Sequence, residues 1–198
     1  YLLVLLFCVL GLVSCGDKNK IPTNEIHYTT IDNEVLPLEN LLNFGEGRIV
    51  SNSYVKDKNL CILKFDKEVT EIWEGAFYGC SNLTSISIPP SIMKIGRFAF
   101  RGCSNLTSIS IPPSVTEIGR SAFSGCSSLT SIVVSKENQV YDSREDCNAI
   151  IHTEINTLIR GCMNTLIPPS VTKIGNYAFS SCSSLTSISI PPSVTEIG

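Results

Sequence analysis

Cysteine is the residue type with the widest chemical scope in this sequence, because a thiol can bind a metal, form a disulfide or carry a lipid chain. Of the nine cysteines, Cys80, Cys103 and Cys126 follow one another at intervals of 23 residues, and Cys182 stands in the same sequence context. No C-x-x-C pair occurs, which gives a zinc site little support. We expect these four side chains to form a buried apolar column, with disulfides between neighbouring repeats as the alternative.

The sequence contains no recognisable catalytic pattern. Its two histidines, His27 and His152, stand in strand-like runs without a clustered acid or an E-x-x-H pattern. There is no G-x-S-x-G elbow, no P-loop and no Rossmann glycine pattern. We therefore expect a protein that is not an enzyme, with no catalytic, cofactor-binding or metal-binding residues, no cofactor and no small-molecule substrate.

Composition and charge narrow the class of partner. The chain carries 15 Lys and Arg against 18 Asp and Glu, and its formal net charge is −3. A protein that binds nucleic acid would favour a basic stripe, so we expect no nucleic-acid partner. Hydrophobic residues make up 43% of the sequence, which is enough to build a core.

The first fifteen residues, YLLVLLFCVLGLVSC, indicate export. As a helix, the uncharged run 1–13 would rise about 20 Å, which is too short for the ~30 Å bilayer core but typical of a signal peptide. Leu12-Val13-Ser14-Cys15 resembles the lipobox of bacterial lipoproteins, in which the cysteine is acylated and becomes the mature N-terminus. This resemblance implies that Cys15 is lipidated and anchors the protein to a membrane. The alternative is an ordinary signal peptide with a chance cysteine.

A near-identical repeat dominates the rest of the chain. CSNLTSISIPPS begins at Cys80 and again at Cys103, and CSSLTSISIPPS begins at Cys182. A period of 23 residues falls in the range of leucine-rich repeats. Side-chain alternation places Ile86 and Ile88 on one face of a short strand, and the proline pair that follows ends the strand because proline lacks an N–H. Each coil can cover its apolar sides only against another coil, so the repeat predicts a solenoid.

We therefore expect an α/β-type repeat solenoid that is mainly β, with 23-residue coils, short strands, and short helical or irregular turns. Phe100 and Phe123, from the A-F segments, should point into its core. Charges of alternating sign occupy one repeat column in two runs, which are Glu71, Lys94 and Glu117, then Lys173 and Glu196. These residues predict cross-coil ion pairs that hold the register.

The repeat pattern IPPSVTEIGxxAFxGCSSLTSI, read at 111–132, resembles the BspA-like branch of the leucine-rich repeats, bacterial surface lipoproteins common in Gram-negative anaerobes. It recurs in part at 88–109 and 167–188, and FDKEVTEIWEGAFYGC (65–80) is a degenerate first copy. The family includes adhesins for host matrix proteins such as fibronectin and fibrinogen, and for other bacteria. The resemblance implies a lipid-anchored outer-membrane protein that binds proteins, facing either the cell surface or the periplasm. The alternative is a spacer or scaffold that carries another domain.

The chain divides into four parts in this interpretation. We expect a signal peptide at 1–14, a lipidated cysteine and tether at 15–24, an N-terminal capping β module at 25–60, and the solenoid at 61–198. The first residue, Tyr1, and an end in mid-repeat indicate a fragment of a longer protein. The capping module should contain two hairpins. We place them around Asp32-Asn33 and Asp57–Asn59.

One coil, at about 135–167, is longer than the others because the proline pairs at 112 and 168 are 56 residues apart. Its segment CNAIIHTEINTLIRGC predicts a β-hairpin that turns near Thr153–Asn156. A two-residue loop at Glu154-Ile155 would place Cys147 opposite Cys162. An exported protein meets an oxidising compartment, so this pair is the strongest disulfide candidate.

Comparison of the copies points to one surface that could bind a partner. The strand face repeats the same small hydroxyl residues, whereas three columns around the A-F pair vary. The varied columns group basic and aromatic residues, which are Tyr78, Arg97, Phe98, Arg101 and Arg120, and which we call the ridge. Arginine and aromatic side chains anchor many protein interfaces, so we predict that the ridge binds protein. The alternative is a solvated convex surface whose residues vary from copy to copy because nothing constrains them.

Overall fold

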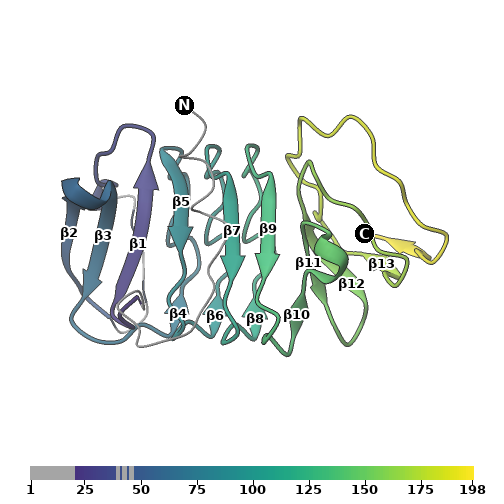
Figure 1. The fold of residues 1–198 in the computed structure, drawn as a ribbon, viewed down its shortest axis with the longest axis horizontal. Coiled ribbons are helices and arrows are strands. Elements are labelled where there is room, and N and C mark those ends of the chain that lie inside the picture. Colours follow the sequence, from purple (N-terminus) through teal and green to yellow (C-terminus); the bar gives the residue numbers. More distant parts are fainter. Residues whose placement is uncertain (1–20, 39–40, 42–43, 45–46) are drawn as a thin grey trace.

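The computed structural model describes residues 21–38, 41, 44 and 47–198. The predicted signal peptide and Cys15 lie outside the described residues. Within the described part, strands and turns build almost the whole chain (Figure 1). No helix in this part is long and apolar enough to cross a membrane.

Three regular coils form the centre of the stack, and each contributes one longer and one shorter strand (Figure 1). The longer strands are β5 (Leu83–Ser87), β7 (Ser108–Ile111) and β9 (Ser131–Val134). The shorter strands are β4 (Glu71–Ile72), β6 (Lys94–Ile95) and β8 (Glu117–Ile118). The shorter strands pair in parallel in that order, and β7 pairs in parallel with β9. The predicted mainly-β solenoid is therefore confirmed.

The core of this stack consists of columns that take one residue from each coil. The Phe77, Phe100 and Phe123 rings are buried, and neighbouring rings stack with centroids 5.2 and 5.3 Å apart. This confirms the inward direction predicted for the phenylalanines. Full burial of a side chain of this size stabilises the fold by about 1.5–3 kcal/mol relative to exposure.

Backbone hydrogen bonds join each coil to the next. Phe77 N donates to Ala99 O at 2.7 Å, and one coil later Phe100 N donates to Ala122 O at 2.8 Å. The coils approach so closely that a Cβ atom at Gly119 would lie 2.4 Å from the Arg97 nitrogen. Only glycine fits there, because the backbone of the preceding coil fills the space.

Ion pairs follow the same register. Lys94 Nζ lies 3.6 Å from Glu71 Oε1 and 3.4 Å from Glu117 Oε1. In the later coils, Lys173 Nζ lies 2.6 Å from Glu196 Oε1. The predicted charge columns are therefore confirmed. These side chains are partly exposed, so solvent screens the pairs, and they act mainly on register.

An antiparallel unit precedes the coils, in the strand order β2-β3-β1-β5. Its elements are β1 (Glu25–Thr30), β2 (Ile49–Val55), the 3-10 turn η2 (Lys56–Lys58) and β3 (Leu60–Phe65). The hairpin predicted at Asp57–Asn59 is confirmed, because β2 and β3 pair across η2. The hairpin predicted around Asp32-Asn33 is wrong. Strand β1 pairs with β3 on one edge and with β5 on the other, which leaves no edge for the strand that follows it in sequence.

A five-stranded sheet follows the regular coils, in the order β10-β11-β12-β13-β14. Its elements are β10 (Tyr141–Asp142), the 3-10 turn η3 (Arg144–Asp146), β11 (Ala149–His152), β12 (Thr157–Gly161), β13 (Lys173–Ile174) and β14 (Glu196–Ile197). Strands β11 and β12 pair antiparallel and turn through residues 153–156, as predicted. Strands β12, β13 and β14 return to parallel pairing.

The predicted Cys147–Cys162 disulfide is not present in the structure, where both residues are free, buried thiols. A bulge between Ile150 and Ile151 shifts the hairpin register by one residue. The two cysteines consequently belong to different parts of the core: Cys147 packs in the smaller apolar cluster and Cys162 in the larger one. The Cys162 thiol donates to Asn148 O at 3.4 Å instead of forming a bridge.

The last copy of the repeat does not form its longer strand. Residues 185–190 read LTSISI, as in the first copies, yet no strand is present there. Ile190 is 47% exposed, whereas its counterpart Ile88 is 8% exposed. The preceding copy is shortened, because six positions separate Cys162 from Pro168 where nine separate the matching residues of the earlier copies. Without a full-length neighbour the segment lacks hydrogen-bond partners for a ladder.

The column arrangement predicts that core and strand-face positions differ sharply in their effect on stability. Phe100→Ala should lower the free energy of unfolding by about 3–5 kcal/mol, because it leaves a cavity in a stacked column. Ser108→Ala, at an exposed position of β7, should change it by less than about 0.5 kcal/mol. Urea unfolding of both variants tests this, and equal losses would show that the two faces of the coil have been exchanged.

Candidate functional site

The structure brings four of the five ridge residues into one cluster. Arg97 Cζ lies 4.5 Å from the centroid of the Phe98 ring. Arg101 Cζ lies 5.0 Å from the same ring and 5.8 Å from the ring of Tyr78. The two arginines and Tyr78 are exposed, and Phe98 is half-buried. The cluster therefore presents cations against aromatic faces, a favourable electrostatic arrangement.

Arg120, the fifth residue of the ridge, continues the cluster into the next coil. Its carbonyl accepts a hydrogen bond from Phe98 N at 3.3 Å. Its guanidinium lies 5.0 Å from the ring of Tyr177 rather than over the other ridge aromatics. Tyr177 is 54% exposed and was not among the predicted site residues. It occupies the same repeat column as Phe98, so the sequence did contain the signal that identifies it.

Phe98 of the ridge and the neighbouring Tyr177 stand at a strained backbone position. The residues of this column, Gly75, Phe98, Ser121 and Tyr177, all have positive φ, between 57° and 69°. Left-handed backbone costs a residue with a side chain about 1–2 kcal/mol, and glycine adopts it freely. The first coil uses glycine, whereas two later coils place exposed or half-buried rings there. Side chains kept at such a position point to a role other than core packing.

A shallow groove of about 510 Å³ runs beside the ridge. Arg97 and Arg120 line it together with the ion-paired charges Glu71, Lys94 and Glu117. Trp73, which is 43% exposed, also lines the groove and was missed in the sequence. Its signal was a tryptophan in a column that is otherwise glycine. In the later coils of this column, the backbone of the preceding coil leaves no room for a side chain. Trp73 belongs to the first coil, so no preceding coil excludes its side chain.

The strand face has a different character. Its outward residues on β5, β7 and β9 are mainly serine and threonine, and Val133 is a large apolar residue exposed among them, at 50%. Thr29 Oγ1 hydrogen-bonds with Thr84 Oγ1 at 2.7 Å and with Ser85 Oγ at 2.6 Å, so β1 already engages part of the hydroxyl row. This face offers no arginine and no aromatic anchor.

The repeat cysteines form the buried column that the sequence predicts at Cys80, Cys103 and Cys126, whereas Cys182 is half-buried. The Cys103 thiol donates to Phe77 O at 3.2 Å, and the Cys126 thiol donates to Phe100 O at 3.2 Å. Burial raises the pKa of Cys126 to about 12, so its thiol stays neutral at pH 7. A neutral, buried thiol is a poor nucleophile, so this column serves packing.

The two histidines do not share a site. His27, on β1, lies with Nε2 3.0 Å from Glu25 Oε2. His152, on β11, packs edge-on against the Tyr141 ring, with the centroids 5.5 Å apart. The two strands belong to different sheets. In the described part of the chain, no group of three or more His, Cys, Asp or Glu side chains is placed to hold a metal ion.

Comparison with known proteins identifies the repeats. The family described as "BspA type Leucine rich repeat region" matches the chain in six copies over residues 47–157 and 159–198. Among solved structures, a leucine rich cell surface protein from Faecalibacterium prausnitzii is 35% identical with a TM-score of 0.57, covering 66% of this chain and 35% of that one. The chain thus spans about a third of that protein's length. No curated protein matches the sequence.

A more distant structure shares the fold alone. The pneumococcal vaccine antigen PcpA is 17% identical, with a TM-score of 0.50, and the match covers 66% of this chain and 45% of PcpA. The chain therefore spans less than half of that antigen.

The left-handed backbone at Phe98 predicts an unusual order of stability. Phe98→Gly should be more stable than Phe98→Ala by about 1 kcal/mol, because only glycine relieves the positive φ while both changes remove the ring. Thermal unfolding of the two variants side by side measures the difference. If the alanine variant were the more stable one, the backbone at this column would not be left-handed.

Proposed function

The chain belongs to the BspA-type leucine-rich repeat family, and from that premise we propose that it is a non-catalytic adhesin that binds proteins at the bacterial surface. Leucine-rich repeats of bacterial surface proteins are a protein-interaction fold. The Faecalibacterium prausnitzii relative carries "cell surface" in its name, which supports display of this chain outside the cell. The ligand of the adhesin is proposed to be a host matrix protein.

The ridge is the observation that carries this proposal. It combines the exposed Arg97 and Arg101 with the rings of Phe98 and Tyr78, and its third arginine, Arg120, lies against the neighbouring ring of Tyr177. Arginine and aromatic residues dominate the energetics of many interfaces, whereas small hydroxyl residues contribute little. The rings of Phe98 and Tyr177 are also kept at a backbone position that favours glycine. These features favour the ridge over the strand face as the contact surface.

Charge indicates what kind of partner surface the ridge would meet. The chain as a whole is slightly acidic, so the arginines form a local basic area against that background. Such an area steers an acidic partner surface into contact, and this steering weakens as salt screens it. The proposed partner surface is therefore acidic and carries apolar or aromatic groups that can contact Phe98 and Tyr78.

Removal of the ridge charges should weaken binding and its salt dependence together. We expect Arg97→Ala combined with Arg101→Ala to reduce binding to immobilised fibronectin or fibrinogen, and to flatten the loss of binding between low and moderate salt. Surface plasmon resonance with the whole chain in neutral detergent measures both effects.

The matched control places charges on the other face. Ser108→Glu combined with Ser110→Glu, both at exposed positions of β7, should leave binding unchanged if the ridge is the contact surface. Loss of binding in this variant, with little effect of the arginine changes, would assign the interface to the strand face. If no immobilised host protein binds the unaltered chain, the adhesin proposal fails. The uniform strand face would then favour a spacer or scaffold that carries another domain.

The organisation of the chain in this proposal follows from export. Residues 1–14 are the signal peptide, Cys15 carries the lipid, and residues to 24 form a tether to the outer membrane. Residues 25–60 cap the solenoid, and β1 supports this by pairing with β5 at the start of the stack. Residues 61–198 present the ridge to the partner. A lipid anchor with several acyl chains holds the protein firmly, at about 0.8 kcal/mol per buried CH₂.

The anchor can be tested apart from binding. Cys15→Ser should abolish acylation and move the protein from the membrane fraction to the soluble fraction of the cell envelope, because serine lacks the acceptor thiol. Metabolic labelling with a fatty-acid analogue and fractionation give the readout, and Cys8→Ser is the control that should keep both label and membrane attachment. An unlabelled wild-type chain would contradict the lipoprotein assignment.

A further inference from the structure

The shallow groove beside the ridge is built from the same short segment of three successive coils. The segments that supply its lining read E-I-W-E at 71–74, K-I-G-R at 94–97 and E-I-G-R at 117–120. The isoleucine of each segment packs into the core, whereas the tryptophan or glycine and the charged residues line the groove. The groove therefore runs along the stack, with a glycine floor between two rows of charged side chains.

The floor of the groove is bare backbone. A Cβ atom at Gly96 would lie 2.5 Å from Glu74 N, and Gly119 is equally crowded, so no side chain can fill the floor. The backbone groups of Gly96 are already engaged, because its N–H donates to Ile72 O at 2.7 Å and its carbonyl accepts from Ala99 N at 3.2 Å. Gly119 repeats both bonds one coil later. A peptide that binds by adding a strand would therefore find no free ladder here.

The indole ring of Trp73 lies at the first-coil end of the groove. Its side chain is 43% exposed, although a large apolar ring in water is unfavourable. The glycines of the next two coils show that the column does not need a ring for packing. A flat, exposed indole can stack on the apolar C–H face of a sugar ring, because the face of the indole carries partial negative charge. This contact would cover the exposed part of Trp73.

Charges along the groove cancel. Three carboxylates and three cations line it, which are Glu71, Glu74 and Glu117, then Lys94, Arg97 and Arg120. Lys94 is held between the glutamates of its own row, as described above. In the other row, the side chains of Glu74, Arg97 and Arg120 form no hydrogen bond or ion pair within the described part of the chain. A neutral lining with donors and acceptors matches a neutral ligand rich in hydroxyl groups, because a hydroxyl both donates and accepts.

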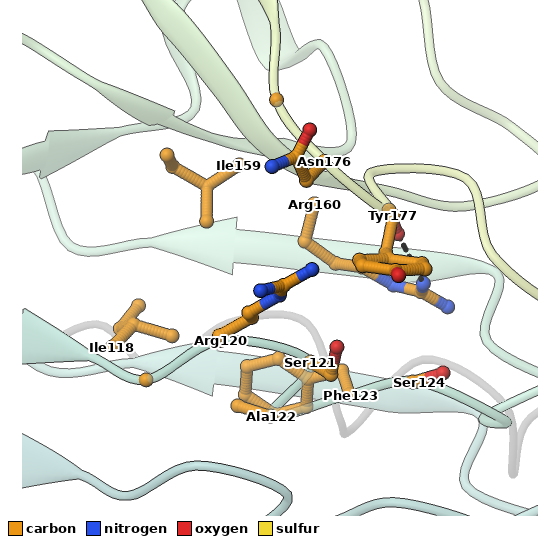
Figure 2. A pocket seen from close by; sticks show the side chains of 12 residues that line it. Ile118, Arg120, Ser121, Ala122, Phe123, Ser124, Ile159, Arg160, Asn176 and Tyr177 are labelled. Carbon is orange, nitrogen blue, oxygen red and sulfur yellow. Dashed lines mark hydrogen bonds between the residues drawn. The ribbon is translucent and has the colours of Figure 1, made fainter. Parts of the chain in front are cut away.

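We propose that this groove binds a neutral oligosaccharide, laid along the coils with one ring stacked on Trp73 and its hydroxyls bonded to the charged rows. Paired strands β4, β6 and β8 lie about 4.8 Å apart, close to the repeat of one ring in an extended sugar chain, so the three coils match about three rings. Arg120 bounds the far end, where its guanidinium lies 5.0 Å from the Tyr177 ring (Figure 2). The site does not require the ridge to bind protein, although Arg97 and Arg120 belong to both.

Trp73 reports directly on this site, because it is the only tryptophan of the chain. The test titrates the whole chain, in a neutral detergent without a sugar headgroup, with cellotriose, maltotriose and β-1,4-mannotriose, and with sorbitol as the control. We expect at least one trisaccharide to shift the tryptophan emission to shorter wavelength and to saturate, because a stacked ring removes water from the indole. Sorbitol has hydroxyls but no ring face, and should cause no shift. The proposal fails if no trisaccharide gives a saturable change.

Charged ligands and peptides test the class of ligand. Trigalacturonate carries a carboxylate on every ring, and a capped Glu-Tyr-Glu peptide represents an acidic protein partner. Both should change the emission less than the best neutral trisaccharide at the same concentration, because the lining has no net charge. A stronger, saturable response to either would assign the groove to an acidic sugar or to a protein and would overturn the proposal.

Variants separate the groove from the ridge, with sugar binding measured by calorimetry. Trp73→Ala should abolish binding of the trisaccharide, and Trp73→Phe, which keeps a smaller ring, should weaken it several-fold. Arg101 belongs to the ridge but does not line the groove, so Arg101→Ala should bind the sugar as the unaltered chain does. Trp73→Ala should in turn keep any binding to fibronectin or fibrinogen, so the two proposals can fail independently. Sugar binding that survives Trp73→Ala would place the ligand elsewhere and contradict the inference.

Discussion

Backbone hydrogen bonds between successive coils are the interaction on which the rest of this structure depends. A coil of 23 residues has neither a helix nor a hairpin of its own, so many of its N–H groups donate to a neighbouring coil, as Phe77 N and Phe100 N do to the following one. The phenylalanine stack, the thiol donors and the alternating ion pairs all repeat because this ladder sets one register for every column. Gly96 and Gly119 are required for the same reason, since any side chain there would meet the preceding backbone.

The ladder also explains where the molecule departs from its pattern. The enlarged coil replaces a fourth regular turn with the β11–β12 hairpin, and the donors of the third coil lose their acceptors at that boundary. A cavity of about 280 Å³, lined by residues 118–124 and 175–177, lies at this interruption. The side chains of the ridge project from the turns and do not enter the ladder, although Arg120 also lines this cavity.

Much of the architecture could be predicted because its contacts join residues 23 positions apart, a spacing that is visible in the sequence. The inward Phe100 and the Glu71–Lys94 pair follow from that spacing alone. The errors arose where the neighbour is not a copy. Identical LTSISI segments form a strand beside a full coil but not at residues 185–190, and a one-residue bulge separates Cys147 from Cys162. The ridge was predicted by comparing copies, but no copy resembles Arg160, so nothing in the sequence signalled that its side chain is buried.

Amide hydrogen exchange on the whole chain tests this account most directly. The Phe100 and Phe123 side chains are both buried and occupy the same column, so burial alone would protect their amides equally. Phe77 N and Phe100 N each donate to the following coil, whereas Phe123 N does not. We therefore predict slow exchange at Phe77 and Phe100 and much faster exchange at Phe123. Equal protection at Phe100 and Phe123 would show that the ladder continues past the third coil, and would contradict the account.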